Sequence, residues 1–572
     1  MAAVRSKIAA LARSPLVWIL CGVLVLHSVG IGWGLPSDDG WDDDGVAPRD
    51  FLVGVVQTFT PGKYYTYPPA HVILLALLTS PIWLPTLLRA PSLSPAVLVP
   101  SFTTVPIMTA FSLVARTTSL AMSLGIVFAL ARVAKELRSR RAGLAVAAVV
   151  SLNAPFAYYS HTSNLDVPCA FWACFALLHF VRAIVRREPH RMRAAGVLAA
   201  LSIATKDQAA ALYLLGAPLA LAAWFACDEW ARRHARALVT QLFVSGVIAL
   251  ALVLLVDGAL VNPSGFRARL AFLLGSASQD YAGYASTWSG RLAIVRNALA
   301  EFPRFYPWPF AFLGLVGLRA ATISREPAHR AAAMVPLFFA VSFFVLFNCL
   351  ARRTDERFLL PQSLVIGVYA GIGLDALFDG APHWLRPLAF AGALGLLVWG
   401  LFECAAVDAN LVSDPRYAAE NWLNSHVRPG DTLEVYGNQV YLPRLPSKAR
   451  VLRVDQRPID QRNPLAGALE IDAPFEEVDR RSPQWIVLTD SQLWPYLVSA
   501  DEFRKTGRTF PPGQRSAQGD ESARAYFRDL IAGRRGYEVA HVSTWHSAIW
   551  PRFRIHGSTG EEICILERSS QP

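Results

Sequence analysis

Long apolar segments separated by short basic runs constrain the fold of this chain most. Stretches of about 20 apolar residues, long enough to cross a bilayer as helices, recur through the first 405 residues. Of the 572 residues, 53% are hydrophobic and only 17% are charged, whereas about a quarter of the residues in soluble domains are charged. The sequence therefore predicts a polytopic α-helical membrane protein.

The basic residues predict the topology. Lys and Arg fall mainly in the short segments between apolar stretches, and such runs stay in the cytoplasm. They explain the net charge of +11, so no nucleic-acid partner is expected. We expect the first apolar segment, after basic residues 1–14, to be an uncleaved helix with a cytoplasmic N-terminus. About 11 spans are predicted, at residues 15–35, 113–134, 142–159, 165–185, 194–205, 209–226, 238–256, 305–318, 333–350, 358–377 and 388–405.

Two segments outside these spans are predicted to lie on the outer side of the membrane. Residues 70–88 are apolar but contain Pro81 and Pro85, and counting them as a span would move the basic run at 132–141 outside. We expect them to lie in the interface or to re-enter the membrane, within a large first outer loop at 36–112. A second outer segment, beginning at Asn262, is expected to be a loop of roughly 45 residues.

The last part of the chain has a different pattern. After residue 405, polar turns separate short amphipathic helices from short apolar strands. Helices are predicted at 416–427 and 521–532, and strands at 432–436, 484–488, 537–542 and 563–566. The predicted organisation is a transmembrane domain over 1–405 and an extracytoplasmic α/β domain over 406–572.

An acidic run, Trp41-Asp42-Asp43-Asp44-Gly45, follows the first apolar segment. Three consecutive aspartates repel one another and serve no core, so their place beside a membrane span points to chemistry. The topology, which was assigned without these aspartates, puts four further polar segments on the same outer face. Those segments are residues 64–71, 161–168, 205–208 and 352–357.

These residue types suit group transfer from a lipid phosphate. A carboxylate can act as general base on a hydroxyl, while Lys206 and Arg357 could bind and stabilise a departing phosphate. Structural alternatives stay open. The acidic run could be a solvated face or could bind a divalent cation, Lys206 could reach to the interface, and Asp166 could cap the helix that follows it.

The order of the motifs resembles a known family. The acidic run is followed by Tyr67-Pro68-Pro69, Tyr159-Ser160-His161-x-x-Asn164-x-Asp166-Val167-Pro168, Ala204-Thr205-Lys206-Asp207-Gln208 and Arg357-Phe358-Leu359-Leu360-Pro361. This order, over residues 16–377, resembles the bacterial branch of the protein O-mannosyltransferase and ArnT-like family. These enzymes, which include the RgtA/B/C/D-like proteins, are C-type (GT-C) membrane glycosyltransferases.

The resemblance implies a reaction and its residues. It implies inverting transfer from a polyprenyl-phosphate-linked sugar to a hydroxyl of a lipid, glycan or protein acceptor, with an acidic residue of the first outer loop as base. The usual signature there is Asp-Glu, whereas this chain has Asp43-Asp44 or Asp44-Gly45, and we prefer Asp44, then Asp43. The residues expected around the donor phosphate and substrate are Lys206, Arg357, His71, Tyr67, His161, Asp166 and Arg353.

Other functions and ligands are also considered. A secondary transporter would have an internal repeat and ionisable groups in the middle of several spans, and a non-catalytic envelope-assembly protein would leave the acidic run unexplained. No metal site is predicted, because the seven cysteines form no CxxC pair and no second histidine lies at ligand spacing from His161. A divalent cation at the acidic run is not firmly expected.

Overall fold

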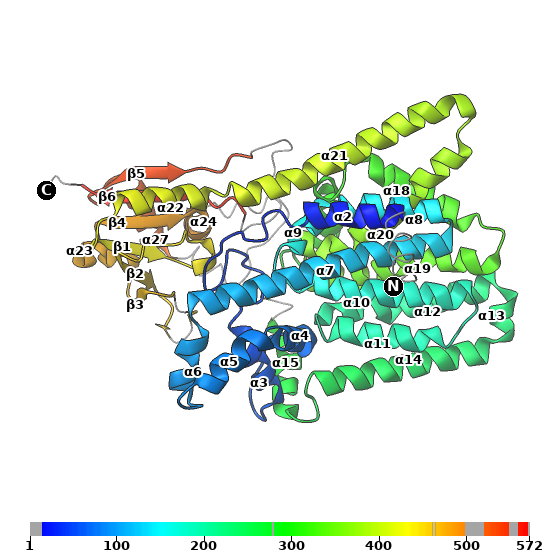
Figure 1. Ribbon diagram of the computed structural model, residues 1–572, viewed down its shortest axis with the longest axis horizontal. Helices are drawn as coiled ribbons and strands as arrows, with labels where there is room; N and C mark the ends of the chain where they lie inside the picture. Colours follow the sequence, from blue (N-terminus) through cyan, green and yellow to red (C-terminus); the bar gives the residue numbers. More distant parts are fainter. Residues whose placement is uncertain are drawn as a thin grey trace, which may run out of the picture.

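The computed structural model describes residues 14–276, 280–459, 462–463, 465–497, 520–547 and 559–569. Residues 1–13, which hold most of the basic segment predicted to precede the first span, lie outside them. A helical bundle and a smaller α/β part lie end to end along the molecule (Figure 1). The polar segments predicted to meet lie where these two parts join.

The bundle contains the expected long apolar helices. In the described part of the chain, seven helices are long and apolar enough to cross a membrane, or up to nine if two bent helix pairs are each one span. This confirms a polytopic helical membrane protein. The helices are α7 (Val105–Leu137), α10 (Asp166–Val185), α12 (Ala210–Cys227), α14 (Ala235–Val256), α19 (Pro327–Phe343) with the π-helix η3 (Phe344–Arg352), α20 (Glu356–Gly380) and α21 (Arg386–Val412).

Judged by the length and composition of the described helices, the predicted number of about 11 spans is therefore too high. Three of the predicted spans form helices of only 12, 13 and 14 residues, α2 (Pro15–Leu26), α11 (Arg191–Ile203) and α18 (Pro309–Thr322). About 20 residues are needed to cross the hydrocarbon core of a bilayer. The predicted segments are helical, but α2 ends at Leu26, α18 begins only at Pro309, and α11 is about as short as the span predicted there.

The span predicted at 142–159 is broken in two. Helices α8 (Arg140–Ser151) and α9 (Ala154–Ser160) meet at a bend of 72°. The Asn153 side chain caps α9 by accepting a hydrogen bond from the Phe156 amide, and Pro155 lies in the first turn of α9. A capping residue followed by proline starts a new helix, which explains the bend.

The first outer loop is largely helical. It contains α3 (Asp50–Phe59), α4 (Pro69–Leu78), α5 (Ser80–Arg89) and α6 (Pro95–Phe102), which lie beside the bundle at the end nearest the sheet (Figure 1). Helices α4 and α5 are bent by 69° at their junction, a geometry that fits the predicted interfacial or re-entrant segment.

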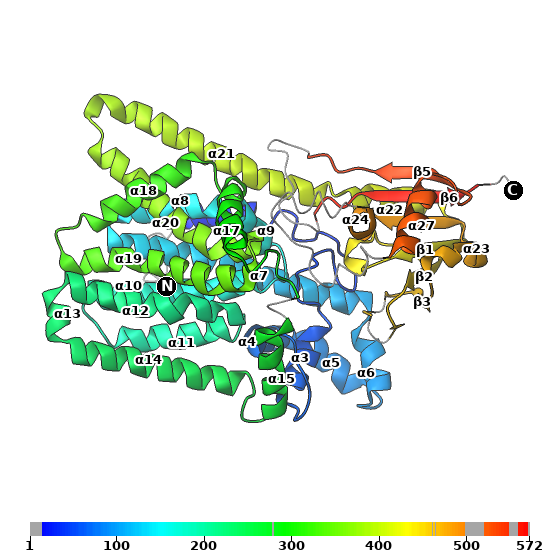
Figure 2. The same cartoon turned by 180° about the vertical axis from the view of Figure 1, so that it is seen from behind.

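The second outer segment is not the loop that we expected. It contains α15 (Pro263–Leu274) and α17 (Trp288–Ala300), the first capped by Asn262. Helix α17 packs beside η3, on the side of the bundle seen in Figure 2. Two short helices therefore occupy the segment that was predicted to be a loop.

The C-terminal part is a mixed α/β sheet domain, as predicted. Six strands lie in the order β3-β2-β1-β4-β6-β5; β3, β2, β1 and β4 are parallel to one another, and β6 is antiparallel to both β4 and β5. The four predicted strands are confirmed, but β2 and β3 were missed. The strands are β1 (Thr432–Tyr436), β2 (Arg450–Asp455), β3 (Ala468–Asp472), β4 (Trp485–Thr489), β5 (Tyr537–Ser543) and β6 (Ile563–Arg568).

Helices cover both faces of this sheet. Helix α22 (Pro415–His426) packs on one face through Ala419 and Leu423, and α27 (Glu521–Ile531) packs on the other through Phe527 and Leu530. The shorter helices α23 (Val478–Arg481) and α24 (Asp490–Leu497) lie at strand ends. Only Ser413 and Asp414 separate α21 from α22, so the last bundle helix leads directly into the sheet domain.

Candidate active site

The acidic run forms a tightly held turn. Asp42 is buried, and its Oδ1 accepts hydrogen bonds from the Tyr158 hydroxyl and the Asp44 amide, both at 3.3 Å. The backbones of Val46 and Ser163 are joined by a hydrogen bond of 3.3 Å, and the Ser163 hydroxyl donates to the Val46 carbonyl at 3.1 Å. Asp42 therefore stabilises the turn that presents Asp43 and Asp44.

The close approach of Ser163 accounts for Gly45. A Cβ atom at position 45 would lie 2.8 Å from Ser163 Oγ and 3.2 Å from an Asp42 carboxylate oxygen. A side chain there would have to displace the Ser163 hydroxyl, which bonds the Val46 carbonyl. Glycine thus lets the turn lie close to Ser163.

Asp44 and Arg357 form an ion pair across the site. Arg357 lies in the first turn of α20, next to the buried Phe358. The guanidinium of Arg357 lies 4.7 Å from the centre of the Phe358 ring, and the groups of Arg353 and Lys206 lie 5.4 and 5.5 Å from it. One ring therefore collects three cations, each within cation–π distance.

Lys206 and Asp166 form a second ion pair. Lys206 Nζ lies 2.6 Å from Asp166 Oδ1, and the two side chains are only 16% and 9% exposed. Asp166 opens α10, where the Asn164 side chain accepts a hydrogen bond from its amide. Lys206 lies just before the short helix η1 (Asp207–Ala209), so two helix starts bring these charges together.

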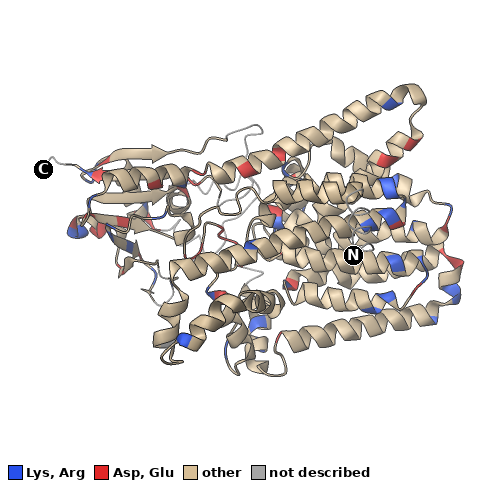
Figure 3. Ribbon diagram, viewed as in Figure 1, with Lys and Arg blue, Asp and Glu red and all other residues tan. Residues whose placement is uncertain are grey.

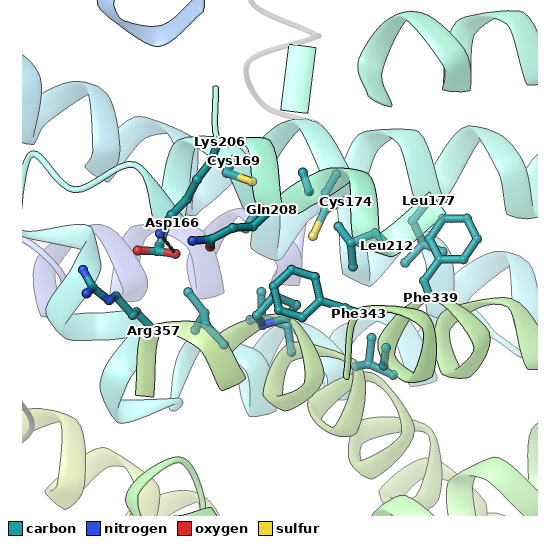
Figure 4. Close-up of a pocket in the computed structure, with 18 of the residues that line it drawn as sticks. Asp166, Cys169, Cys174, Leu177, Lys206, Gln208, Leu212, Phe339, Phe343 and Arg357 are labelled. Carbon is teal, nitrogen blue, oxygen red and sulfur yellow. Dashed lines mark hydrogen bonds and ion pairs between the residues drawn. The ribbon is translucent and has the colours of Figure 1, made fainter. Parts of the chain in front are cut away.

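A narrow cavity extends from this ion pair into the bundle, and about 60 Å³ of it is accessible to water. We call it the bundle cavity. Charged and amide side chains gather at one end, and apolar side chains line the rest (Figure 4). The polar end consists of Asp166, Lys206, Gln208 and Arg357, and the apolar part includes Cys169, Ala173, Cys174, Leu177, Leu212, Phe339, Phe343, Leu360 and Leu364. The lining therefore has the same chemical division as an amphiphile with an anionic head and a hydrocarbon chain.

Four other predicted residues lie outside the lining of this cavity. His161 is buried, with Nε2 3.3 Å from an Asp408 oxygen and Nδ1 2.6 Å from the Ala157 carbonyl. His71 is buried in α4, and neither ring nitrogen has a hydrogen-bond partner among the described residues. Tyr67 is exposed. Arg353 Nε donates to the Tyr281 carbonyl at 3.2 Å, and burial and the neighbouring Arg357 lower the pKa of Arg353.

Asp43 faces the sheet domain. Its Oδ2 accepts a hydrogen bond of 2.5 Å from the Tyr441 hydroxyl. Burial, and then the charge of Asp43, raise the pKa of Tyr441 above its usual range. The structure thus brings Arg357, Lys206 and Asp166 to the bundle cavity and pairs Asp44 with Arg357, while Asp43 has a partner from the other part of the chain.

Sequence reasoning missed three residues at this site. Gln208 belongs to the motif at 204–208, and its position beside Lys206 at a helix start is a signal for a polar group at the site. Phe358 looked like the apolar beginning of a span, so its contacts with three cations gave no signal. Tyr441 follows a predicted strand, and nothing local to it points to Asp43.

No metal site emerges from the described residues, where no group of three or more His, Cys, Asp or Glu side chains is placed to hold an ion. The seven cysteines are all free thiols.

The chain was compared with known proteins. Residues 103–256, which contain α7 to α14, match the family described as Dolichyl-phosphate-mannose-protein mannosyltransferase. No curated protein matches. Among solved structures, ArnT from Cupriavidus metallidurans bound to undecaprenyl phosphate has a TM-score of 0.50 and 15% sequence identity, over 84% of this chain and 93% of that chain.

The chain has the fold of the GT-C membrane glycosyltransferases. The resemblance seen in the sequence is confirmed for the fold and for the family that residues 103–256 match. That stretch contains Asp166 and Lys206, whereas the acidic run and Arg357 lie outside it.

A second group of similar structures comes from an archaeon. The oligosaccharyltransferase AglB from Archaeoglobus fulgidus, in complex with an inhibitory peptide and a dolichol-phosphate, gives a TM-score of 0.46 at 14% identity over 74% of this chain. The same enzyme tethered to an acceptor peptide with the NVT sequon gives 0.45 at 14% identity, also over 74% of this chain. The present chain spans 62% of the length of those archaeal chains.

Proposed function

We propose that this protein is an inverting glycosyltransferase that moves a sugar from a polyprenyl-phosphate-linked donor to an acceptor hydroxyl at the outer face of the cytoplasmic membrane. The observation that carries the proposal is the bundle cavity, which has two cations at one end and an apolar lining along the rest. A lipid phosphate has the same division between an anionic head and a hydrocarbon chain. The family that residues 103–256 match, and the undecaprenyl phosphate bound to the similar ArnT, support the same donor class.

In the proposed mechanism, Asp44 is the general base. It takes the proton from the acceptor hydroxyl as the oxygen attacks the anomeric carbon, and the bond between that carbon and the phosphate oxygen breaks. Attack from the side opposite the phosphate inverts the anomeric configuration. The acceptor leaves glycosylated, and the other product is the polyprenyl phosphate.

Lys206 and Arg357 have the complementary role. Their charges lie at the polar end of the cavity, where they would stabilise the negative charge that grows on the departing phosphate. Arg357 is paired with Asp44. We propose that the donor phosphate replaces Asp44 as the partner of Arg357, which leaves the carboxylate available to the acceptor. Asp166 then holds Lys206 in place through their ion pair.

The proposed orientation rests on the distribution of charge. Lys and Arg residues concentrate at the end of the bundle that lies away from the sheet (Figure 3). The positive-inside rule would put that end in the cytoplasm, and the acidic run and sheet domain outside. Labelling of cysteines introduced into the sheet domain, with a membrane-impermeant reagent on intact cells, tests this orientation.

The function is tested by sugar transfer with the purified protein in lipid nanodiscs. Radiolabelled polyprenyl-phosphate sugars would be offered with envelope extracts as acceptors, and the wild type would be compared with Asp43→Asn, Asp44→Asn and the double variant. We expect transfer by the wild type and its loss in the double variant. A fully active double variant would exclude the mechanism, and solute uptake into sealed vesicles without any transfer would indicate a transporter instead.

A separate experiment can identify the substrates. Comparing the glycans of the cell envelope with and without this protein by mass spectrometry would identify the sugar and show whether the acceptor is a lipid, a glycan or a protein.

A further inference from the structure

We propose that the sheet domain forms part of the active site, and that Tyr441 is a positioning residue that acts on the acidic run through Asp43. This inference rests on the proposed function, because it assigns different roles to Asp43 and Asp44 in the same reaction. Asp44 is the base, and Asp43 attaches the catalytic turn to the sheet domain.

One short turn of the sheet domain contacts the first outer loop at two places. Tyr441 ends the 3-10 helix η5 (Gln439–Tyr441), and its hydroxyl donates a hydrogen bond of 2.5 Å to Asp43 Oδ2. At the other end of this turn, the Gln439 amide donates to an Asp39 oxygen. The turn therefore binds the first outer loop on both sides of Trp41.

A buried arginine fixes this turn against the loop. Arg416 has no exposed surface, and its guanidinium lies 4.2 Å from the centre of the Trp41 ring. Its Nε and one terminal nitrogen each lie 2.8 Å from an Asp414 oxygen, and the other terminal nitrogen donates to the Val440 carbonyl at 2.7 Å. Because Val440 lies within η5, Arg416 joins the turn that carries Tyr441 to the residue that precedes the acidic run.

The neighbouring aspartates consequently face different environments. Asp44 pairs with Arg357, which lines the bundle cavity, whereas Asp43 is bonded to a residue nearly four hundred positions later in the chain. The raised pKa of Tyr441 keeps its hydroxyl protonated, and so a donor, through neutral and alkaline pH. A persistent hydrogen bond to Asp43 fixes the direction of the next carboxylate along the turn.

The test is a double-mutant cycle in the transfer assay with the full chain. Tyr441→Phe removes only the hydroxyl, Asp43→Asn weakens the acceptor, and the double variant removes both. We expect Tyr441→Phe to lower kcat about tenfold with an unchanged KM for the donor, since a hydrogen bond to a charged group contributes about that factor or more. The double variant should be no slower than the slower single variant, because both changes break one contact.

Tyr537→Phe is the matched control. Its hydroxyl is buried in the same domain and donates to the Pro483 carbonyl at 2.9 Å, away from the acidic run. This variant should keep the wild-type kcat. An unchanged kcat in Tyr441→Phe, or multiplicative losses in the double variant, would overturn the inference.

Thermal unfolding of the same variants separates this inference from the proposed function. If the wild type transfers no sugar from any lipid-phosphate donor, the proposed function fails. The contact is then judged by the unfolding midpoints. Non-additive shifts for Tyr441→Phe and Asp43→Asn would retain it, whereas additive shifts would reject the attachment of the turn to the sheet domain.

Discussion

The bundle cavity and the junction between the acidic run and the sheet domain both hold charged residues, but they are built in opposite ways. We define the junction as Trp41, Asp43, Arg416, Gln439 and Tyr441. The cavity has charges at one end of an open, apolar space between helices. In the junction, a fully buried arginine lies against the Trp41 ring and joins residues far apart in the chain. We propose that the first arrangement binds a ligand, whereas the second attaches a turn to the sheet domain.

Asp44 lies between these two regions, and its replacement should have the largest effect. Asp44→Asn removes the proposed base while keeping the shape of the side chain, so kcat should fall about 10²- to 10⁴-fold, the usual contribution of general base catalysis. Single-turnover transfer assays would measure this. Asp379→Asn is a control, because Asp379 pairs with Arg138 and Arg141 instead. If Asp44→Asn lowers kcat less than fivefold, Asp44 is not the general base.

Lys206 tests whether the polar end of the cavity binds the donor. Lys206→Met should raise the KM for the donor or lower kcat by about 10- to 100-fold, because one of two cations near the phosphate is lost. The change also leaves Asp166 buried without its cation, which should lower stability.

The double variant Lys206→Met/Asp166→Asn separates these two effects. It should recover the unfolding midpoint but not the activity, since the buried charge is gone while the phosphate still lacks its ligand. The exposed Lys448, whose ammonium donates a hydrogen bond to the Asn424 carbonyl, provides the control Lys448→Met. Recovery of activity together with stability would show that Lys206 serves structure alone.

The apolar lining can be tested by filling it. Ala173→Leu adds three carbon atoms to the wall of the cavity and should raise the KM for a long polyprenyl donor about three- to tenfold, with a smaller effect for a donor with a short chain. Ala222→Leu, at an exposed position of α12, should change neither value. Equal effects on long and short donors would mean that the hydrocarbon chain does not occupy this space.

The smallest expected effect concerns a buried acid of the sheet domain. Glu561 is fully buried, accepts hydrogen bonds from the Ser491 amide and hydroxyl, and has a pKa raised by burial to about 7. A raised pKa means that the folded state favours the protonated acid, so this contribution is complete below pH 4.5 and is lost as the pH rises through about 7. The loss amounts to up to about 3 kcal/mol for a shift of this size.

Glu561→Gln should therefore make the unfolding midpoint less dependent on pH between 5 and 8. The change should be a few degrees, measured in detergent with the wild type alongside. An identical pH dependence in both proteins would show that the acid does not titrate in this range.

The two regions also differ in how far sequence could predict them. Lys206, Asp166 and Arg357 were found because basic runs fix topology, and topology places helix ends on one face. The topology therefore predicted which polar residues lie at the cavity, but not which of them form ion pairs. Lys206 was predicted to face a phosphate, whereas in the structure its ammonium contacts Asp166.

The junction could not be predicted for a physical reason. Tyr441 meets Asp43 because the sheet domain packs on the first outer loop, and such packing leaves no periodic signal in either segment. The strand β2 was missed for a related reason. It contains Arg453, which is buried and pairs with Glu470, so a core position looked like a surface one.

The short link between α21 and α22 has a consequence for these weak contacts. Because only Ser413 and Asp414 separate the two helices, the sheet domain is always presented to the first outer loop at a high effective concentration, in the range that short tethers produce. A single phenol–carboxylate bond would not hold two separate molecules together in solution. Within one chain, the bond only has to stabilise one orientation of the sheet domain relative to the first outer loop. A few such bonds are enough for that.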